Sequence, residues 1–221
     1  MNIVIGITNG SWRAVALGIL FGGLLAGSII VFIPEAAPIS NVLTGVVPSF
    51  RWYPLVRDDF KVLDSLLDLL FELESQQAGD IYVLASSYVL NDGIMRNYCR
   101  LGPRPLSFCD RIIYVNHIDK RDGFPRQFLD ALYVVVTDPI QYHLRSDDQR
   151  VIGILAREVA EGQGIGRFYQ LLPGEFRLSE GVTARVYSKV HPFERSDLDA
   201  LAAEFGRYYP DRRNLFIIPT Q

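Results

Sequence analysis

The sequence has few of the residues on which several common functions depend. Its 221 residues include only two cysteines, Cys99 and Cys109, and three histidines. Two thiols are too few for a disulfide scaffold or a four-thiolate zinc site, and neither cysteine lies near a histidine in the sequence. No Gly-x-Ser-x-Gly nucleophile elbow occurs either. We therefore predict no catalytic residue, no metal ion and no cofactor.

Positive charge is not concentrated anywhere in the chain. The 22 Lys and Arg residues are outnumbered by 25 Asp and Glu residues, which gives a net charge of −3, and no Lys/Arg-rich run occurs. This balance argues against a nucleic-acid partner. The apolar fraction of 49% excludes a disordered chain. The sequence beyond the N-terminal segment is long enough for one domain with its own core.

A long apolar run near the N-terminus, residues 14–33, contains no charged residue. As a helix of about 20 residues it would span roughly 30 Å, the thickness of the hydrocarbon core of a bilayer. A cleavable signal peptide has a shorter apolar region and a small-x-small site, and a buried helix of a soluble protein is rarely free of charge over this length. We therefore predict a single transmembrane helix over residues 14–33. Arg13 precedes it and the next basic residue is Arg51, so residues 1–13 are expected in the cytoplasm and the C-terminal part in the periplasm or lumen.

Small residues gather on one side of this predicted helix. At 100° per residue, one row of small residues contains Ala14, Gly18, Gly22 and Ala26. Two further glycines, Gly23 and Gly27, extend this small surface round the helix. Such a face lets a neighbouring backbone approach closely, which favours association in lipid. We expect the helix to pack on a polytopic membrane partner within the lipid bilayer. The alternative is a plain anchor, because glycine is common in membrane helices.

The rest of the chain is predicted to be a linker, residues 34–55, and an extracytoplasmic α/β domain, residues 56–221. Apolar spacing of three and four predicts helices over residues 57–77, 91–98, 124–130, 147–162 and 196–208. Short apolar runs predict strands over residues 80–87, 111–115 and 132–137, a hairpin over residues 176–189 and an edge strand over residues 215–219. This alternation predicts a layered domain with a mostly parallel sheet and a C-terminal β-hairpin.

Polar residues follow two of the predicted strands at their C-terminal ends, where open α/β sheets bind ligands. The candidate ligand contacts are Ser86, Asn91, Asp92, Asp138, Gln141 and His143. The alternative is structural: Asp138 and Pro139 form a turn, and His143 packs near the next helix.

Four other patterns have an ordinary structural explanation beside a functional one. Gly162, Gly164 and Gly166 resemble half a dinucleotide fingerprint but follow a helix, so a helix C-cap and loop is favoured. His117, Asp119 and Asp122 contain metal-ligand types but are expected to be solvated. Asp64, Asp68 and Glu72 form a carboxylate stripe that is expected to face solvent, with Lys61 offsetting part of the repulsion. Cys99 and Cys109 flank a short loop, and outside the cytoplasm they can form a disulfide.

Three stretches carry a resemblance to a known family: IYVLASSYVLND, DALYVVVTDPIQYHL with DDQRVIGIL, and FRLSEGVTARVYSKVHPF. They resemble the C-terminal extracytoplasmic domain of bacterial, including cyanobacterial, GT-C membrane glycosyltransferases of the protein-mannosyltransferase or aminoarabinose-transferase type. The resemblance covers residues 55–193 and extends to the membrane helix before the domain. It implies a polyprenyl-phosphate-linked sugar donor. The acidic catalytic residue of such enzymes lies in an early loop that has no counterpart here, so no catalytic residue is carried over.

Three functions follow from these observations. The first is a non-catalytic, membrane-anchored accessory subunit or domain whose helix packs on a polytopic partner and whose α/β domain covers the partner's outer face. The alternative is the C-terminal part of a glycosyltransferase that contributes acceptor or donor contacts. The third is a ligand-binding domain tethered to the membrane.

Overall fold

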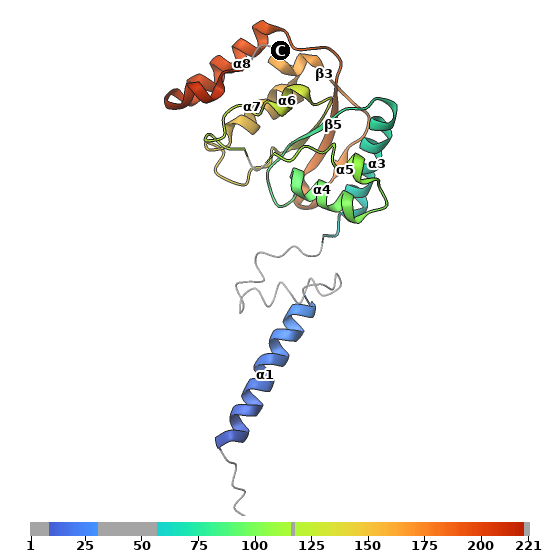
Figure 1. Ribbon diagram of the computed structural model, residues 1–221, viewed down its shortest axis with the longest axis vertical. Helices are drawn as coiled ribbons and strands as arrows, with labels where there is room; N and C mark the ends of the chain where they lie inside the picture. Colours follow the sequence, from blue (N-terminus) through green and yellow to red (C-terminus); the bar gives the residue numbers. More distant parts are fainter. Residues whose placement is uncertain (1–8, 31–56, 116–117, 219–221) are drawn as a thin grey trace, which may run out of the picture. The chain divides into compact units, whose positions relative to one another are not determined.

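The computed structural model describes residues 9–30, 57–115 and 118–218 (Figure 1). The chain divides into two units, Met1–Asp58 and Asp59–Gln221. The predicted linker, residues 34–55, lies outside the described residues.

Helix α1, Asn9–Ile30, is the described element of the first unit. The segment contains no proline and its single charged residue is Arg13, so its sequence holds no strong helix breaker. Large apolar side chains along it are exposed: Trp12, Val15, Leu17, Ile19, Phe21 and Leu25. A Cβ atom built at Gly18, Gly22 or Gly23 would meet nothing within 4 Å. In the described part of the chain, no helix meets the length and hydropathy criteria for crossing a membrane.

The second unit is an α/β domain around a five-stranded mixed sheet. Its strands are β1 (Ile81–Leu84), β2 (Tyr133–Asp138), β3 (Tyr169–Leu171), β4 (Phe176–Arg177) and β5 (Thr183–Lys189). The order is β1–β2–β5–β3, with β4 paired to β5. Strands β1 and β2 are parallel, whereas β5 runs antiparallel to β2, β3 and β4.

Helices cover both faces of this sheet. The helices are α3 (Phe60–Gln76), α4 (Asp92–Leu101), α5 (Leu106–Cys109), α6 (Gln127–Asp130), α7 (Arg150–Glu161) and α8 (Arg195–Tyr208), with shorter 3-10 turns η3 (Gly164–Phe168), η4 (Ser179–Gly181) and η5 (Pro210–Phe216). Side chains of a strand alternate between the faces, so the sheet contributes to two cores. Ile81 and Val83 pack in the core that contains α3 and α4, while Tyr82 and Leu84 pack in the core that contains α7 and α8. Figure 1 shows these helix groups on opposite sides of the sheet.

The structure confirms the predicted α/β class and the hairpin, but the prediction of a mostly parallel sheet was wrong. Only β1 and β2 are parallel among the described strand pairs. The sheet is mixed because β5, the second strand of the hairpin, also pairs antiparallel with β2 in the middle of the sheet. In addition, residues 111–115 do not form the further strand that was predicted.

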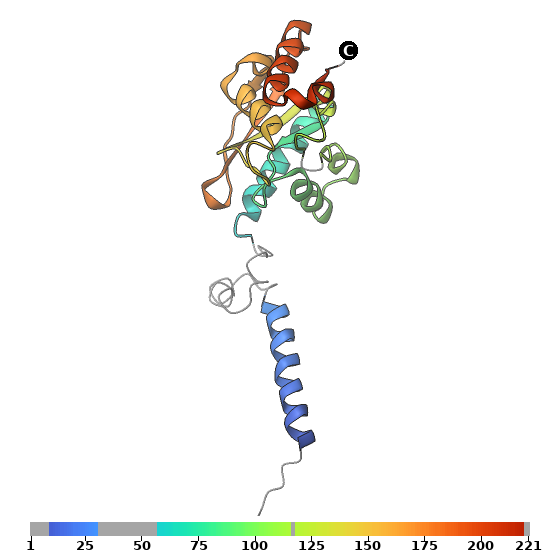
Figure 2. The same cartoon turned by 90° about the vertical axis from the view of Figure 1, so that its left-hand side faces the viewer.

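Two other predicted strands are absent from the described sheet. Residues 111–115 join β1 only through an isolated bridge between Ile81 and Ile112, so the pairing ends after one residue. Of the segment predicted as an edge strand, residues 215–219, Leu215 and Phe216 belong to η5, and Ile217 and Ile218 lie in no strand. The centre of the buried Phe216 ring lies 5.2 Å from the ring centres of both Phe205 and Tyr209, so this segment packs on α8. Figure 2 shows η5 beside α8 near the C-terminus.

Candidate functional site

The candidate ligand contacts lie at or after the ends of the parallel strands β1 and β2, in the two segments that lead on to α4 and α7. Asp138 is the last residue of β2, and Asp92 is the first residue of α4. The loops are joined by a backbone hydrogen bond in which the Ser86 N–H donates to the Gln141 carbonyl, at 3.0 Å. The two predicted loops therefore do lie side by side, as the ends of parallel neighbours should.

A buried glutamine that the sequence reasoning missed holds these loops together. Gln149 is fully buried, and its Oε1 accepts hydrogen bonds from the backbone N–H groups of His143 (2.8 Å) and Leu144 (2.9 Å). Its Nε2 donates to the Ser86 hydroxyl (3.2 Å) and to the Ile118 carbonyl (3.4 Å). The amide thus uses both of its donors and accepts twice, which a buried amide needs. Gln149 is a structural clamp at the predicted site.

The residues that follow Ser86 are also used within the protein. Asn91 is the N-cap of α4: its Oδ1 accepts from the Ile94 N–H at 2.7 Å, and its Nδ2 donates to the Ser87 carbonyl at 2.7 Å. Asp92 is buried, and its Oδ2 accepts from the Val115 N–H at 2.9 Å. The predicted ligand contacts Asn91 and Asp92 therefore cap a helix and fix a loop.

The residues of the second loop lie nearer to solvent. The Asp138 side chain is 71% exposed, and its Oδ2 lies 3.5 Å from Nη1 of Arg185. The Nε2 of Gln141 donates to the Pro139 carbonyl at 3.0 Å, and His143 is exposed. The edge therefore combines a buried polar network on the β1 side with surface groups on the β2 side.

The glycine motif is part of the end of α7, as the structural interpretation predicted. Gly162 is left-handed at φ 65° and caps the helix. A Cβ at Gly166 would overlap the carbonyl oxygen of Glu158, and a Cβ at Gly164 would crowd its carboxylate. The Ile165 N–H donates to Oε2 of Glu158 at 3.0 Å. Gly164 and Gly166 are therefore needed for close packing of η3 on α7, whereas Gly162 is needed for its left-handed backbone.

Glu158 has an unusual electrostatic environment as a result. The pKa of Glu158 is raised to about 7, mainly by burial, and the nearby Glu204 carboxylate acts in the same direction. The Ile165 N–H acts in the opposite direction because it stabilises the charged carboxylate. A half-buried carboxyl that titrates near neutral pH makes the contact between α7 and α8 sensitive to pH.

The loop considered as a metal site is occupied by an ion pair. The Asp119 carboxylate is buried and binds Arg121, which lowers the pKa of Asp119. The Asp119 N–H donates to Oδ2 of Asp122 at 2.8 Å. His117 lies outside the described residues. Within those that are described, no group of three or more His, Cys, Asp or Glu residues is arranged to hold a metal ion.

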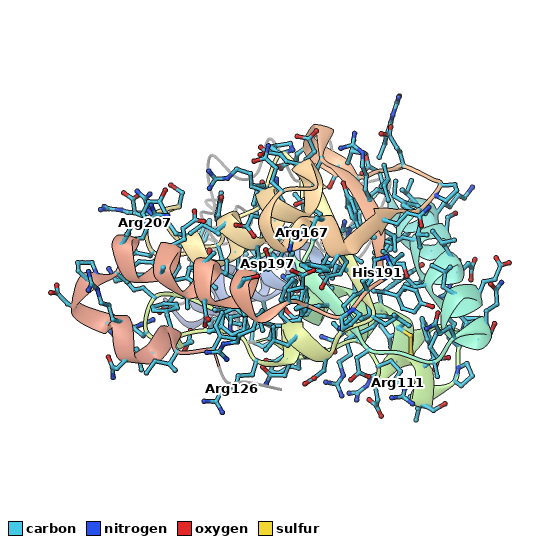
Figure 3. The ribbon with its side chains drawn as sticks, turned by 90° about the horizontal axis from the view of Figure 1, so that it is seen from above. Arg111, Arg126, Arg167, His191, Asp197 and Arg207 are labelled. Atoms are coloured by element: carbon cyan, nitrogen blue, oxygen red, sulfur yellow. A yellow bond between two sulfur atoms is a disulfide. The ribbon has the colours of Figure 1, made fainter. Side chains whose placement is uncertain are left out.

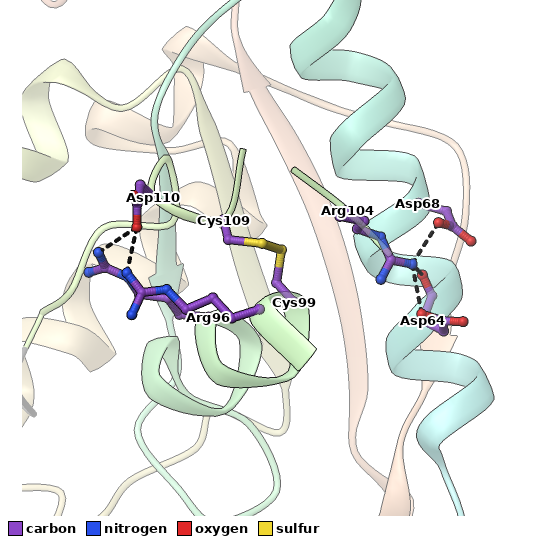
Figure 4. The surroundings of a disulfide bond; sticks show 8 residues. Asp64, Asp68, Arg96, Cys99, Arg104, Cys109 and Asp110 are labelled. Carbon is purple, nitrogen blue, oxygen red and sulfur yellow. Dashed lines mark hydrogen bonds and ion pairs between the residues drawn. A yellow bond between two sulfur atoms is a disulfide. The ribbon is translucent and has the colours of Figure 1, made fainter. Parts of the chain in front are cut away.

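The carboxylate stripe on α3 has a partner that was not predicted. Nη2 of Arg104 lies 2.7 Å from Oδ1 of Asp64 and 2.6 Å from Oδ1 of Asp68 (Figure 4). Asp64 and Asp68 do face solvent as predicted, with side chains that are 48% and 68% exposed, but Arg104 was not predicted as the cation that binds them. Arg104 lies far from them in sequence, so helical spacing gave no signal of the contact.

Cys99 and Cys109 form a disulfide whose Cα atoms lie 5.6 Å apart, and both residues are fully buried. Nearby, Arg96 and Arg100 both donate to Oδ1 of Asp110, at 2.9 and 2.6 Å. The disulfide thus joins α4 to α5 at the side of the domain that packs on α3 (Figure 4).

No known family model matches the chain, and no curated protein or solved structure is significantly similar to it. The resemblance to membrane glycosyltransferases therefore stays a prediction.

Proposed function

We propose that this protein is a non-catalytic, membrane-anchored accessory subunit. In this proposal, residues 14–33 cross the bilayer and pack on a polytopic membrane partner, and the α/β domain lies outside the cytoplasm and covers the partner's outer face. The observation that carries the proposal is the uncharged apolar run of residues 14–33, most of which lies in α1.

The apolar side chains of α1 need a non-aqueous environment. Leu17, Ile19 and Phe21 are 62%, 72% and 70% exposed in the chain by itself. Burying one such side chain contributes roughly 1.5–3 kcal/mol. Lipid and a protein partner are the two environments that would bury a whole helix of this composition, and the proposal uses both.

The glycines of α1 support a protein contact on one side. The positions Gly18 and Gly22 are one turn apart, and Gly23 widens the same small surface. Space for a Cβ is open at all three. Close approach of a second backbone is the favourable use of such a surface in lipid.

The disulfide supports an extracytoplasmic domain. Disulfides persist in the periplasm, the lumen of the secretory pathway and outside the cell, and they are rare in the cytosol. Arg13 before the apolar run and the absence of basic residues from 34 to 50 favour the same orientation.

The non-catalytic part of the proposal is supported by how the candidate residues are used. Ser86, Asn91 and Asp92 serve as hydrogen-bond partners inside the fold, and Asp138 pairs with Arg185. This leaves the candidate edge without an evident nucleophile paired with a base.

Membrane insertion is tested by alkaline extraction of membranes from a bacterial host that expresses the full chain. The native chain should stay in the membrane pellet. Leu17→Arg combined with Phe21→Arg should release it, because each arginine at mid-span costs about 2.5–3.5 kcal/mol of insertion free energy. The control Ser11→Arg adds one positive charge before the apolar run and should not release the chain. Full extraction of the native chain would refute the proposal.

A further inference from the structure

A cleft of about 190 Å³ lies between the loop before α7, α7 itself and the end of α8. The loop contributes Tyr142 and Ser146, α7 contributes Arg150 and Arg157, and α8 contributes Tyr208. Drug-sized ligands occupy pockets of roughly 300–1,000 Å³, so this cleft suits a smaller group.

The two arginines lie on the same face of α7. They are seven residues apart, or about two turns, which places their Cα atoms about 10 Å apart along the helix axis. Gly153 and Ile154 lie between them on that face and also line the cleft. Because Gly153 has no side chain, the helix surface is hollow between the two positive charges.

Tyr142 reaches into this hollow. A Cβ at Gly153 would overlap the Tyr142 hydroxyl, so only glycine lets the phenol lie there. In the described part of the chain, that hydroxyl makes no hydrogen bond. Burial raises the pKa of Tyr142, and Arg157 and Arg150 act against this rise. The hydroxyl therefore stays protonated at neutral pH and can donate a hydrogen bond between the two arginines.

The arginines differ in how they are held. Arg150 pairs with Asp147, and its guanidinium lies 4.5 Å from the centre of the Tyr208 ring. These contacts fix its position. The Arg157 side chain forms no ion pair or hydrogen bond with any described residue. The cleft thus has one positioned and one available guanidinium, and its single carboxylate, Asp147, is already paired.

We propose that this cleft binds a phosphomonoester. A guanidinium group matches the geometry of two phosphate oxygens. A phosphate group also accepts several hydrogen bonds at once, here from Arg157, from the Tyr142 hydroxyl and from the N–H groups of Arg150 that do not bind Asp147. The two arginines and Asp147 give the lining one net positive charge, which attracts an anion. This inference does not depend on the membrane helix or on the accessory role. It adds a ligand to the α/β domain.

The test is isothermal titration of the full chain in detergent with glycerol 3-phosphate, at constant ionic strength. One equivalent should bind saturably. Arg157→Gln should weaken binding about tenfold or more, because a charged hydrogen bond is lost. Tyr142→Phe should weaken it less. Arg157→Gln should melt near the native temperature, since it breaks no hydrogen bond or ion pair with a described residue, which separates loss of binding from unfolding.

The matched control is Arg126→Gln. Arg126 is exposed and points away from the domain, and the substitution removes the same charge (Figure 3). Native affinity in Arg126→Gln with weakened affinity in Arg157→Gln supports the site. Equal affinities in the two variants, or no saturable binding at millimolar ligand, would overturn it.

The phosphomonoester can belong to a soluble metabolite or to a lipid headgroup, and a second arm distinguishes them. The titration is repeated in nanodiscs of phosphatidylcholine with and without phosphatidic acid. If phosphatidic acid competes with glycerol 3-phosphate for the native chain but not for Arg157→Gln, the phosphomonoester belongs to a lipid headgroup. Unchanged, Arg157-dependent binding of glycerol 3-phosphate assigns a soluble one. Competition that persists in Arg157→Gln contradicts the site.

Discussion

Nη2 of Arg104 lies 2.7 Å from Oδ1 of Asp64, and this contact ties the disulfide-closed loop to the long helix α3. The Arg104 side chain is only 4% exposed, whereas that of Asp64 is 48% exposed. Asp68 provides a second acceptor at 2.6 Å. The pair is therefore asymmetric: the cation depends on its partners, while water can solvate the carboxylates if the cation is removed.

This asymmetry predicts that removing the two carboxylates lowers the free energy of unfolding more than removing Arg104 does. Asp64→Asn combined with Asp68→Asn should lower the free energy of unfolding by about 2–3 kcal/mol, because it leaves a buried guanidinium without a carboxylate. Arg104→Met should cost about 1 kcal/mol. Circular dichroism during thermal unfolding should show falls in Tm of about 2–4 °C per kcal/mol. Arg100→Met, at a more exposed pair, is the control and should cost under about 1 kcal/mol. A smaller cost for the double Asn variant than for Arg104→Met would contradict this account.

Gln149 predicts a second stability effect. Gln149→Met keeps the shape of the side chain but removes its four hydrogen bonds, and it leaves the N–H groups of His143 and Leu144 without their acceptor. We expect a loss of about 2–4 kcal/mol in the free energy of unfolding. Gln141→Met removes one hydrogen bond at a partly exposed position and serves as the control. Similar losses in the two variants would show that Gln149 is not the clamp.

Glu158 predicts a pH dependence whose sign is fixed. Burial raises its pKa from 4.5 to about 7, so between these values the folded protein holds a proton that the unfolded chain has released. The resulting stabilisation is complete below the unfolded pKa and is lost as the pH rises through 7. Glu158→Gln keeps an acceptor for the Ile165 N–H but cannot ionise.

The Glu158→Gln variant should therefore be more stable than the native protein at pH 8, by about 1 kcal/mol once solvent screening is allowed for, and nearly equal to it at pH 5. Thermal unfolding at both pH values measures the difference. Glu161→Gln, at an exposed position near the end of the same helix, is the control and should show no pH-dependent gain. A difference at pH 5 that equals the difference at pH 8 would exclude titration of Glu158 as the cause.

The disulfide predicts both a stability effect and a chemical signature. Cys99→Ala combined with Cys109→Ala should lower the free energy of unfolding by about 2–3 kcal/mol, as expected for a closed loop of this length. Thiol-reactive polyethylene glycol should label the denatured native chain only after reduction. Labelling of two thiols without a reductant, in protein isolated from membranes under thiol-blocking conditions, would contradict an oxidising compartment.

Local patterns in the sequence predicted the helices and the main strands. The leucines of α3 recur every three or four residues, and β2 is a short β-branched run, so each element is specified by its own residues. The run over residues 111–115 looks similar but pairs with β1 at Ile112 alone. Its pairing depends on where the neighbouring loops place it, which the run itself does not encode.

The candidate edge could be predicted only in outline. Strand ends indicated which loops meet, and the structure joins Ser86 to Gln141. The roles of Gln149 and Arg104 could not be predicted from local patterns. Gln149 joins its own loop to Ser86 and Ile118, 63 and 31 residues away. Arg104 binds Asp64 and Asp68, 40 and 36 residues away. The cleft beside α7 combines residues from a loop and two helices, and only the Arg150–Gly153–Arg157 spacing could have drawn attention to it.

The proposed function requires that the glycine side of the N-terminal helix packs on a membrane partner. The most direct measurement is quantitative co-purification of membrane proteins with the full chain in mild detergent, compared between the native helix, Gly22→Leu with Gly23→Leu, and Leu17→Phe on the other side. The proposal predicts a polytopic protein that is recovered with the native and Leu17→Phe chains and is lost, several-fold or more, with the glycine variant, while the circular dichroism of the α/β domain is unchanged. A chain that runs as a monomer without a membrane partner, or equal recovery with all three helices, would contradict it.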